Sequence, residues 1–159
     1  MNTTAALTRP VPPADVEELV DSVHHVMRGV LHRLHPALEA EGISMGQFWS
    51  MHLVSSLGSA SMGTVARHLS LSAPTVCASI DSLEAAGLVA RRRSQRDRRA
   101  VELSLTPKGR RVEARIWARV GSVMSEAARG VPADDVAAAL RLFREVHTRL
   151  ETLPAGGPA

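Results

Sequence analysis

Six arginines lie within the nine residues from Arg91 to Arg99, and this segment is the most chemically distinctive part of the sequence. A guanidinium group donates hydrogen bonds in a planar fork that matches phosphate oxygens, and arginine also enters narrow minor grooves, where the negative potential is enhanced. The segment therefore predicts contacts with a nucleic-acid backbone. Asp97 would repel DNA, so we expect it to pair with a neighbouring arginine and to fix its direction.

The positive charge of the chain is concentrated around this segment. Residues 1–50 carry three basic and six acidic side chains (−3), residues 51–111 carry ten and four (+6), and residues 112–159 carry six and six (0), which together give the formal charge of +3. Only the middle third is therefore expected to face a polyanion. A solvated basic loop is the alternative that charge alone leaves open.

Two short helices, predicted over about 62–69 and 73–86, precede the arginine-rich segment. In the second helix Val76, Ile80 and Leu83 fall on one side at 100° per residue, which makes that side the buried one. The opposite side carries small, uncharged residues near its N-terminal end, which suits insertion into a major groove about 12 Å wide. The pattern indicates a helix-turn-helix.

Further elements surround this pair of helices. Two strand-like stretches, 88–93 and 100–105, follow it and predict a hairpin with the arginines at its tip. Upstream, Ser44 and Gln47 have the spacing of a capping box that opens another helix. Pro36 cannot donate a backbone hydrogen bond, so the first long helix is expected to end or kink just before it.

The first and last predicted helices each carry a heptad-spaced apolar stripe. One stripe runs from Val16 to Leu34 and the other from Val136 to Leu150. Such stripes are typical of helices that pair with other helices, so we expect them to join two copies of the chain as a homodimer. Core helices of a monomer are the alternative.

These elements predict a mainly α fold with a small β-hairpin wing, in which dimerisation helices flank a winged helix-turn-helix domain. The expected order is a disordered tail (1–13), an N-terminal dimerisation helix (14–40), the DNA-binding domain (44–105), C-terminal dimerisation helices (106–152) and a second disordered tail (153–159). One domain fits the length of the chain.

Motifs of the middle region resemble those of the MarR family of bacterial regulators, in the same order and at the same spacing. They are Val65-Ala66-Arg67-His68-Leu69, Ser72-Ala73-Pro74-Thr75-Val76, Ile80-Asp81-Ser82-Leu83-Glu84, Gly87-Leu88-Val89-Ala90-Arg91, Asp97-Arg98-Arg99 and Leu103-Ser104-Leu105-Thr106-Pro107-Lys108-Gly109. The flanking helices extend the resemblance over about 15–152. The resemblance implies a homodimeric regulator, usually a repressor, that binds a palindromic operator and leaves it when a small molecule binds.

The resemblance also implies which residues contact DNA. The candidates are Arg67, Ser72, Ala73, Pro74, Thr75, Ala78, Ser79, Arg96, Arg98 and Arg99. In this family the 73–86 helix would enter a major groove and the wing an adjacent minor groove, with Arg99 the better candidate for insertion. Asp97 and Arg91 would orient the wing, and Arg91 is expected to pair with Asp81 or Asp97.

The helix that would read DNA departs from some relatives, because small residues replace their long polar side chains. Bidentate contacts to bases are therefore not expected from its exposed face. We expect specificity to depend on the hydroxyl groups of Ser72 and Thr75 and on methyl contacts from Ala73 or Ala78. Minor-groove shape, read by arginine, would add to it and favours AT-rich flanks.

A small-molecule pocket is implied by the family, between the dimer helices and the DNA-binding lobe. Its candidate residues are His24, Met27, Trp49, His52 and Trp117, although core packing explains the two tryptophans equally well. A redox-responsive regulator that uses Cys77 and a metal-responsive one that uses the histidines are alternatives. We expect Cys77 to be half-buried, and the histidines to be solvated or at the dimer interface.

Other classes of protein fit the sequence less well. A single cysteine excludes an internal disulfide and fits a reducing cytoplasm, and no apolar run approaches the length of a membrane span. We find no phosphate-binding loop, nucleophile motif or convincing carboxylate pair, so we expect no enzyme activity and no catalytic residue, cofactor or metal. A winged helix that binds only proteins remains an alternative.

Overall fold

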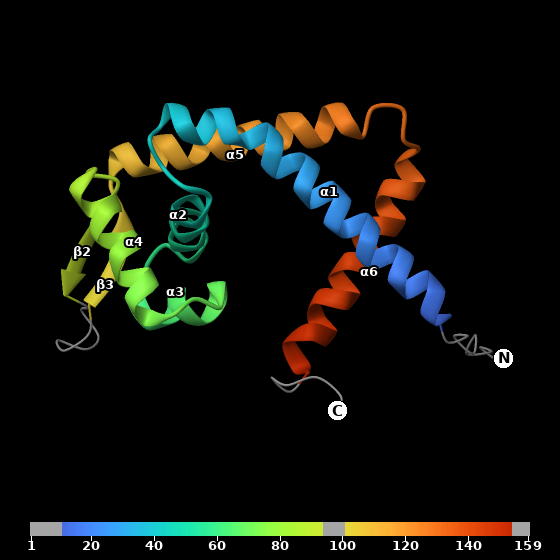
Figure 1. Cartoon of the computed structure of the whole chain (residues 1–159), viewed down its shortest axis with the longest axis horizontal. Helices are drawn as coiled ribbons and strands as arrows, with labels where there is room; N and C mark the ends of the chain where they lie inside the picture. The colour runs from blue at the N-terminus through green and yellow to red at the C-terminus, as the bar shows by residue number, and fades with distance from the viewer. Residues whose placement is uncertain (1–10, 94–100, 154–159) are drawn as a thin grey trace, which may run out of the picture. The chain divides into compact units, whose positions relative to one another are not determined.

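The computed structural model describes residues 11–93 and 101–153 of the chain. Its elements are, in order, α1 (Pro13–Ala40), α2 (Met45–Leu57), β1 (Ala60–Ser61), α3 (Met62–Leu69), α4 (Ala73–Ala85), β2 (Val89–Arg93), β3 (Val101–Leu105), α5 (Pro107–Ala127) and α6 (Ala133–Thr152) (Figure 1). The predicted fold, mainly helical with a small β-hairpin wing, is confirmed. The tails predicted to be disordered lie almost wholly outside the described residues.

Helix α1 continues through Pro36, so the prediction that it ends there is wrong. The missing N–H removes one hydrogen bond, to the carbonyl of His32, while the helix is anchored on both sides of the proline because Leu34 and Leu38 are buried. Figure 1 shows the axis of α1 changing direction in its lighter blue, C-terminal part. Of the two predicted outcomes, an end or a kink of the helix, the kink is the one that agrees with this bend.

The helices around the predicted helix-turn-helix begin at side-chain caps. The capping box of α2 is confirmed: the Gln47 backbone N–H donates to Ser44 Oγ (3.2 Å), and the Ser44 N–H donates to Gln47 Oε1 (2.7 Å). Ser61 caps α3, and Ser72 caps α4 by accepting from the Thr75 N–H at 3.3 Å. These local bonds explain why the helix starts could be read from the sequence.

The core lies beneath these helices and against the sheet. Its most deeply buried side chains come from α1, α2, α3, α4, β2, β3 and α5, and they include Leu34, Phe48, Met51, Val54, Val65, Ile80, Leu83, Val89, Leu103 and Ile116. The buried side of α4 is the one predicted, formed by Val76, Ile80 and Leu83. Burial of this side leaves the opposite side of α4 to solvent.

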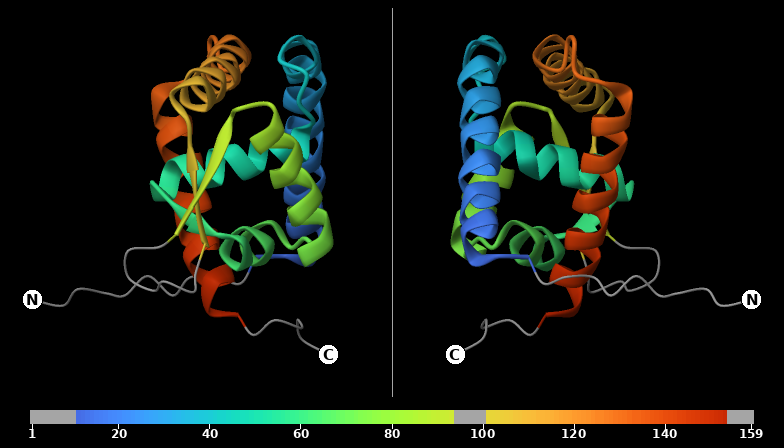
Figure 2. Two further views of the ribbon diagram at one scale, coloured as in Figure 1. Left: turned by 90° about the vertical axis from the view of Figure 1, so that its left-hand side faces the viewer. Right: turned by 90° about the vertical axis from the view of Figure 1, so that its right-hand side faces the viewer.

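The sheet has the strand order β1-β3-β2 and is antiparallel throughout. Figures 1 and 2 show β2 and β3 side by side. Strands β2 and β3 form the predicted hairpin, with Val89 opposite Leu105 and Arg93 opposite Val101. Strand β1, which pairs Ala60 with Leu103, was not predicted. Two residues are too few for the alternation that identifies a strand.

The first turn of α5 lies directly against the turn that follows α4. Gly87, at a φ of +69°, ends α4 in a Schellman motif, in which the Leu88 N–H donates to the Leu83 carbonyl at 2.9 Å. Thr106 Oγ1 donates to the Gly87 carbonyl at 2.7 Å and accepts from the Gly109 N–H at 3.0 Å. A Cβ added at Gly109 would lie 1.9 Å from the Leu88 carbonyl oxygen, so only glycine fits at this position.

The described chain divides into two compact units, the first ending at Val123 and the second beginning at Met124. The first unit holds the core and the sheet. The second contains α6, which has no buried residue and exposes an apolar stripe made by Val136, Leu140, Phe143 and Leu150. In the first unit, α1 likewise exposes Val16, Val20, Val23 and Met27. The predicted stripe of α6 is therefore exposed, whereas the predicted stripe of α1 is exposed from Val16 to Met27 and ends at Leu34, which is buried in the core.

We expect Gly109→Ala to lower the free energy of unfolding by about 1–3 kcal/mol, because overpacking against the Leu88 carbonyl forces the α5 backbone to move. Gly121→Ala, in the same helix but with no atom within 4 Å of the added Cβ, should instead raise it by about 0.5–1 kcal/mol. Urea denaturation followed by circular dichroism measures both. Equal effects of the two substitutions would contradict the close contact.

Candidate nucleic-acid interface

The N-terminal half of α4 presents small side chains to solvent. Ala73, Pro74, Thr75 and Ala78 are all exposed, as predicted from the helix pattern. None of these side chains is charged or longer than a threonine, so the backbone of α4 can approach another surface closely. This half of α4 is the first part of the candidate interface.

Two hydroxyl groups at the start of α4 are already hydrogen-bonded to each other. Ser72 Oγ and Thr75 Oγ1 are 2.7 Å apart, and Ser72 Oγ also accepts the N–H of Thr75. One hydroxyl proton lies between the two oxygens, whichever group donates it. The second proton remains free to donate to a ligand, so the pair offers one outward donor at a fixed position.

Two residues of α4 differ from expectation. Ser79 was a candidate DNA contact, but it is half-buried and its hydroxyl oxygen is inaccessible to solvent with no hydrogen-bond partner in the structure. It faces the protein because it lies three residues after Val76 and four before Leu83, at the edge of the buried side of the helix. Cys77, expected to be half-buried, is exposed, and its Sγ lies 3.7 Å from Asp81 Oδ2.

Arg91 on β2 joins the wing to α4 through two carboxylates. Its NH2 donates to Asp81 Oδ1 at 2.6 Å and its NH1 donates to Glu84 Oε2 at 2.8 Å. Of the two partners predicted for Arg91, Asp81 is confirmed, and Asp97 lies outside the described residues. Glu84 was missed, although its position three residues after Asp81 places both carboxylates on one side of α4.

This ion pair changes the electrostatics of the surface as well as its geometry. The hydrogen bond from Arg91 to Asp81, with the charges of Asp81 and Glu84, raises the pKa of the Arg91 guanidinium above its usual value. The guanidinium in turn offsets one of the two negative charges that Asp81 and Glu84 would otherwise present to a polyanion beside the exposed half of α4. Arg91 therefore acts within the protein and is not a free cation of the surface.

The structure describes some of the other basic residues of the candidate interface but not all of them. Arg67 at the end of α3 is exposed, and so are Arg92 and Arg93 at the end of β2. Four residues predicted at the tip of the hairpin lie outside the described residues, namely Arg96, Asp97, Arg98 and Arg99. Lys108 and Arg110 donate to the backbone carbonyls of Ala86 and Leu105, so they contribute to the fold.

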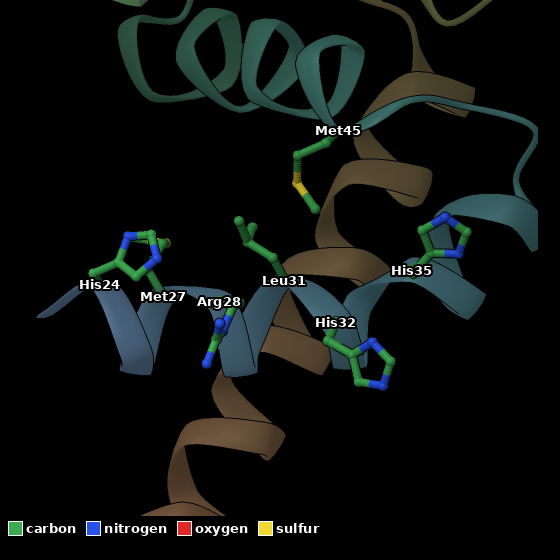
Figure 3. Close-up of a pocket in the computed structure, with 7 residues that line it drawn as sticks. All are labelled: His24, Met27, Arg28, Leu31, His32, His35 and Met45. Atoms are coloured by element: carbon green, nitrogen blue, oxygen red, sulfur yellow. The ribbon is translucent and has the colours of Figure 1, made fainter. Parts of the chain in front are cut away.

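The five predicted ligand-binding residues do not form one site. His24 and Met27 line an open pocket along α1 together with Arg28, Leu31, His32, His35 and Met45 (Figure 3). The close-up shows Leu31 and Met45 reaching toward each other, with His24 and His35 on either side of them. The structure therefore brings two of the five predicted residues to one pocket.

Trp49, His52 and Trp117 belong instead to an aromatic cluster between α2 and α5. The His52 and Trp117 rings are stacked, with centroids 3.9 Å apart, and Trp49 packs edge-on against Trp117 at 6.4 Å. His52 Nδ1 lies 2.8 Å from Oε1 of Glu113, a carboxylate that is only 8% exposed. These contacts hold the two helices together, so their assignment to the pocket is not supported. Glu113 itself was missed.

The histidines of α1 make isolated contacts with their own helix. His25 Nδ1 lies 2.7 Å from the Asp21 carbonyl oxygen, and His35 Nδ1 lies 3.4 Å from Glu39 Oε2. Within the residues that the structure describes, no three histidine, cysteine or acidic side chains are grouped so that they could hold a metal ion. In the same part of the chain, no helix is long and apolar enough to cross a membrane.

Comparison with known proteins links this architecture to one family. The model of the MarR family matches residues 41–100, the part that contains α2 to β2. A MarR family protein from Bacillus stearothermophilus superposes with a TM-score of 0.79 at 20% identity, covering 90% of this chain and all of that one. No curated protein sequence matches the chain.

Two further solved structures show the same fold. The transcriptional regulator BldR from Sulfolobus solfataricus gives a TM-score of 0.70 at 26% identity, covering 87% of this chain and 99% of that one. Staphylococcus aureus MarR, solved in complex with salicylate and kanamycin, gives 0.77 at 19% identity, covering 89% and 96%. The likeness extends over α1 and α6 as well as the winged domain, since nearly the whole chain is covered.

We expect Arg91→Ala to destabilise the protein by about 1 kcal/mol, because it leaves Asp81 and Glu84 without their cation on a partly exposed surface. Arg92→Ala removes the same charge from the neighbouring exposed position and should have little effect. Urea denaturation compares the variants, and hydrogen exchange of the β2 amides should accelerate in Arg91→Ala only. Similar exchange in both variants would show that the ion pair does not fix the wing.

Proposed function

We propose that this chain, whose residues 41–100 match the model of the MarR family and whose fold resembles that of a solved MarR family protein, is a repressor that binds a palindromic DNA operator as a homodimer and leaves it when a small molecule binds. Members of this family are transcriptional regulators and not enzymes, and the fold implies regulation through DNA binding. The observation that carries the proposal for this chain is the exposed N-terminal half of α4, with its small side chains beside an arginine-bearing wing.

Helix α4 is proposed to enter a major groove. Because Ala73 and Ala78 have short side chains, they let the helix lie deep and contact thymine methyl groups, while the Ser72–Thr75 pair donates its free proton to a base or phosphate. Arg67 is placed to contact the backbone. The wing arginines Arg96, Arg98 and Arg99 would read a minor groove, and AT-rich flanks would favour them because those grooves are narrow.

The homodimer is proposed from the exposed apolar stripe of α6 and the exposed N-terminal part of the stripe of α1. Helix α6 leaves every large apolar side chain of its stripe at least 40% exposed, among them Phe143 at 50% and Leu150 at 61%. Contiguous apolar surface of this kind marks an interaction site in a soluble protein. A second copy supplies the same two stripes, and a two-fold dimer matches a palindrome with half-sites about one helical turn apart.

The pocket along α1 is the proposed effector site. Leu31 and Met45 give it an apolar floor, and the imidazoles of His24 and His35 stand at its sides as hydrogen-bonding groups (Figure 3). This combination suits a small aromatic molecule with polar substituents. Salicylate, which is bound in the S. aureus structure, is such a molecule and serves as a probe.

We expect an operator selected from random duplexes to be palindromic, and its affinity for the protein to fall roughly a thousandfold or more between 50 and 200 mM salt. Arg99→Ala should weaken binding about tenfold or more, because it removes a charged contact, and Thr75→Ala less. Arg119→Ala, an equal loss of charge on α5, is the control. Gel shifts across salt concentrations measure all four proteins.

Two results would contradict this proposal in different ways. Failure to select any sequence, with no binding at low salt, would favour a winged helix that binds proteins. A loss from Thr75→Ala as large as that from Arg99→Ala would reverse the ranking of wing over helix. GC-rich wing contacts would likewise exclude the proposed reading of groove shape.

For the effector site, His24→Ala should weaken salicylate binding about three- to tenfold, because it removes a hydrogen-bonding group from the pocket. His25→Ala is the matched control, since the neighbouring His25 does not line the pocket and contacts the Asp21 carbonyl instead. Isothermal titration calorimetry measures both. Equal affinities of the two variants, or no binding to the wild type, would remove the pocket as a site for this class of molecule.

A further inference from the structure

Gln47 connects the first turn of α2 to the proposed recognition helix α4. Its side-chain oxygen accepts the Ser44 N–H at 2.7 Å, and its backbone N–H donates to Ser44 Oγ at 3.2 Å. Its side-chain Nε2 donates to Ser82 Oγ on α4 at 2.9 Å. One side chain therefore completes the helix cap and holds the neighbouring helix as well.

The choice of glutamine at this position is informative. Glutamate would complete the capping box equally well, because only an acceptor is needed to satisfy the N–H of Ser44. Glutamate has no N–H to offer a second partner, whereas the glutamine amide has two. With glutamine, Nε2 donates to Ser82 Oγ, whereas a carboxylate at position 47 could contact Ser82 only by accepting from its hydroxyl.

The same turn of α2 forms a wall of the pocket along α1. Met45 lies between the two capping residues in the sequence, and Leu31 of α1 reaches toward it across the pocket (Figure 3). A molecule seated between Leu31 and Met45 would therefore press directly on the turn that carries Gln47.

The connection between α1 and α2, which precedes this turn, is held by an ion pair with α5. Glu41 Oε1 accepts from Arg115 of α5 at 2.6 Å and 3.1 Å, which holds the connection between α1 and α2 against α5. If Met45 moves, the Glu41–Arg115 ion pair limits how far the connection between α1 and α2 can move with it. The Gln47–Ser82 hydrogen bond links this turn to α4, which also shares the core with α2.

We infer that Gln47 is a positioning residue that transmits occupancy of the α1 pocket to the recognition helix through Ser82. The inference rests on the proposed function, since it assigns a regulatory purpose to the proposed effector site. A ligand changes the position of α4 only if it binds one position better than the other, and displacement of Met45 supplies that difference. Proximity alone does not establish this role, so the coupling between the α1 pocket and α4 must be measured.

The only cysteine of the chain provides a reporter on α4. Cys77 is exposed, so a trifluoromethyl tag on its thiol can report the surroundings of the recognition helix by fluorine NMR. Met45→Phe serves as a permanent occupant of the pocket, and Leu31→Phe fills the same space from α1. Ser82→Ala removes the proposed link while leaving both bonds of the capping box in place. Ser122→Ala, an exposed serine of α5, is the matched control.

Filling the pocket should shift the fluorine resonance in the wild-type background, and Ser82→Ala should reduce that shift by at least half. Ser122→Ala should leave the shift unchanged. A purely structural role for the Gln47–Ser82 bond would alter thermal stability but not the response to Met45→Phe or Leu31→Phe. An undiminished shift in Ser82→Ala, or no shift from either filling substitution, would overturn the inference.

The test needs neither DNA nor an effector, so it separates the inference from the proposed function. If no operator is found while the shift depends on Ser82, the coupling stands and the role in DNA release fails. If an operator is bound but the shift is independent of Ser82, the proposed DNA binding stands and the coupling through Gln47 fails. Where both hold, the loss of operator affinity caused by Met45→Phe should shrink roughly two- to tenfold in Ser82→Ala, as expected for one hydrogen bond.

Discussion

The close approach of α5 to the carbonyl of Leu88 is the constraint on which the arrangement of the winged domain depends. Leu88 follows the turn that ends α4 and comes immediately before β2, so one backbone contact sets the exit of the recognition helix and the start of the wing together. Thr106 and Lys108 add hydrogen bonds to the same turn. A side chain at position 109 would push these three elements apart, because interiors packed this tightly have no space to give.

The second constraint is the balance of charge across the surface of α4 and β2. Asp81 and Glu84 lie beside the half of α4 that is proposed to meet DNA, and Arg91 satisfies both. The basic character of the surface therefore comes from arginines that have no such partner among the described residues, such as Arg67 and Arg92. Counting charges along the sequence identified the region but could not separate the structural arginine from the free ones.

The features that could be predicted from the sequence are those set by local chemistry. The caps at Ser44 and Ser72 involve residues three apart, and the buried side of α4 follows from helical periodicity. Strand β1 could not be predicted, since its pairing with Leu103 joins residues far apart in the chain. The grouping of Trp49, His52 and Trp117 with His24 was not supported for a related reason: the Glu113 contact fixes how α2 faces α5.

The double attachment of α4 has a consequence for how specificity can evolve. Positions 81, 82 and 84 are tied to other elements, so a substitution there requires a compensating change in β2 or α2, and these positions should vary together with 91 and 47. Ala73, Pro74 and Ala78 make no side-chain hydrogen bonds and have free space outside them. Paralogues descended from this chain could therefore acquire new operators by single substitutions at the exposed end of the helix without loss of the scaffold.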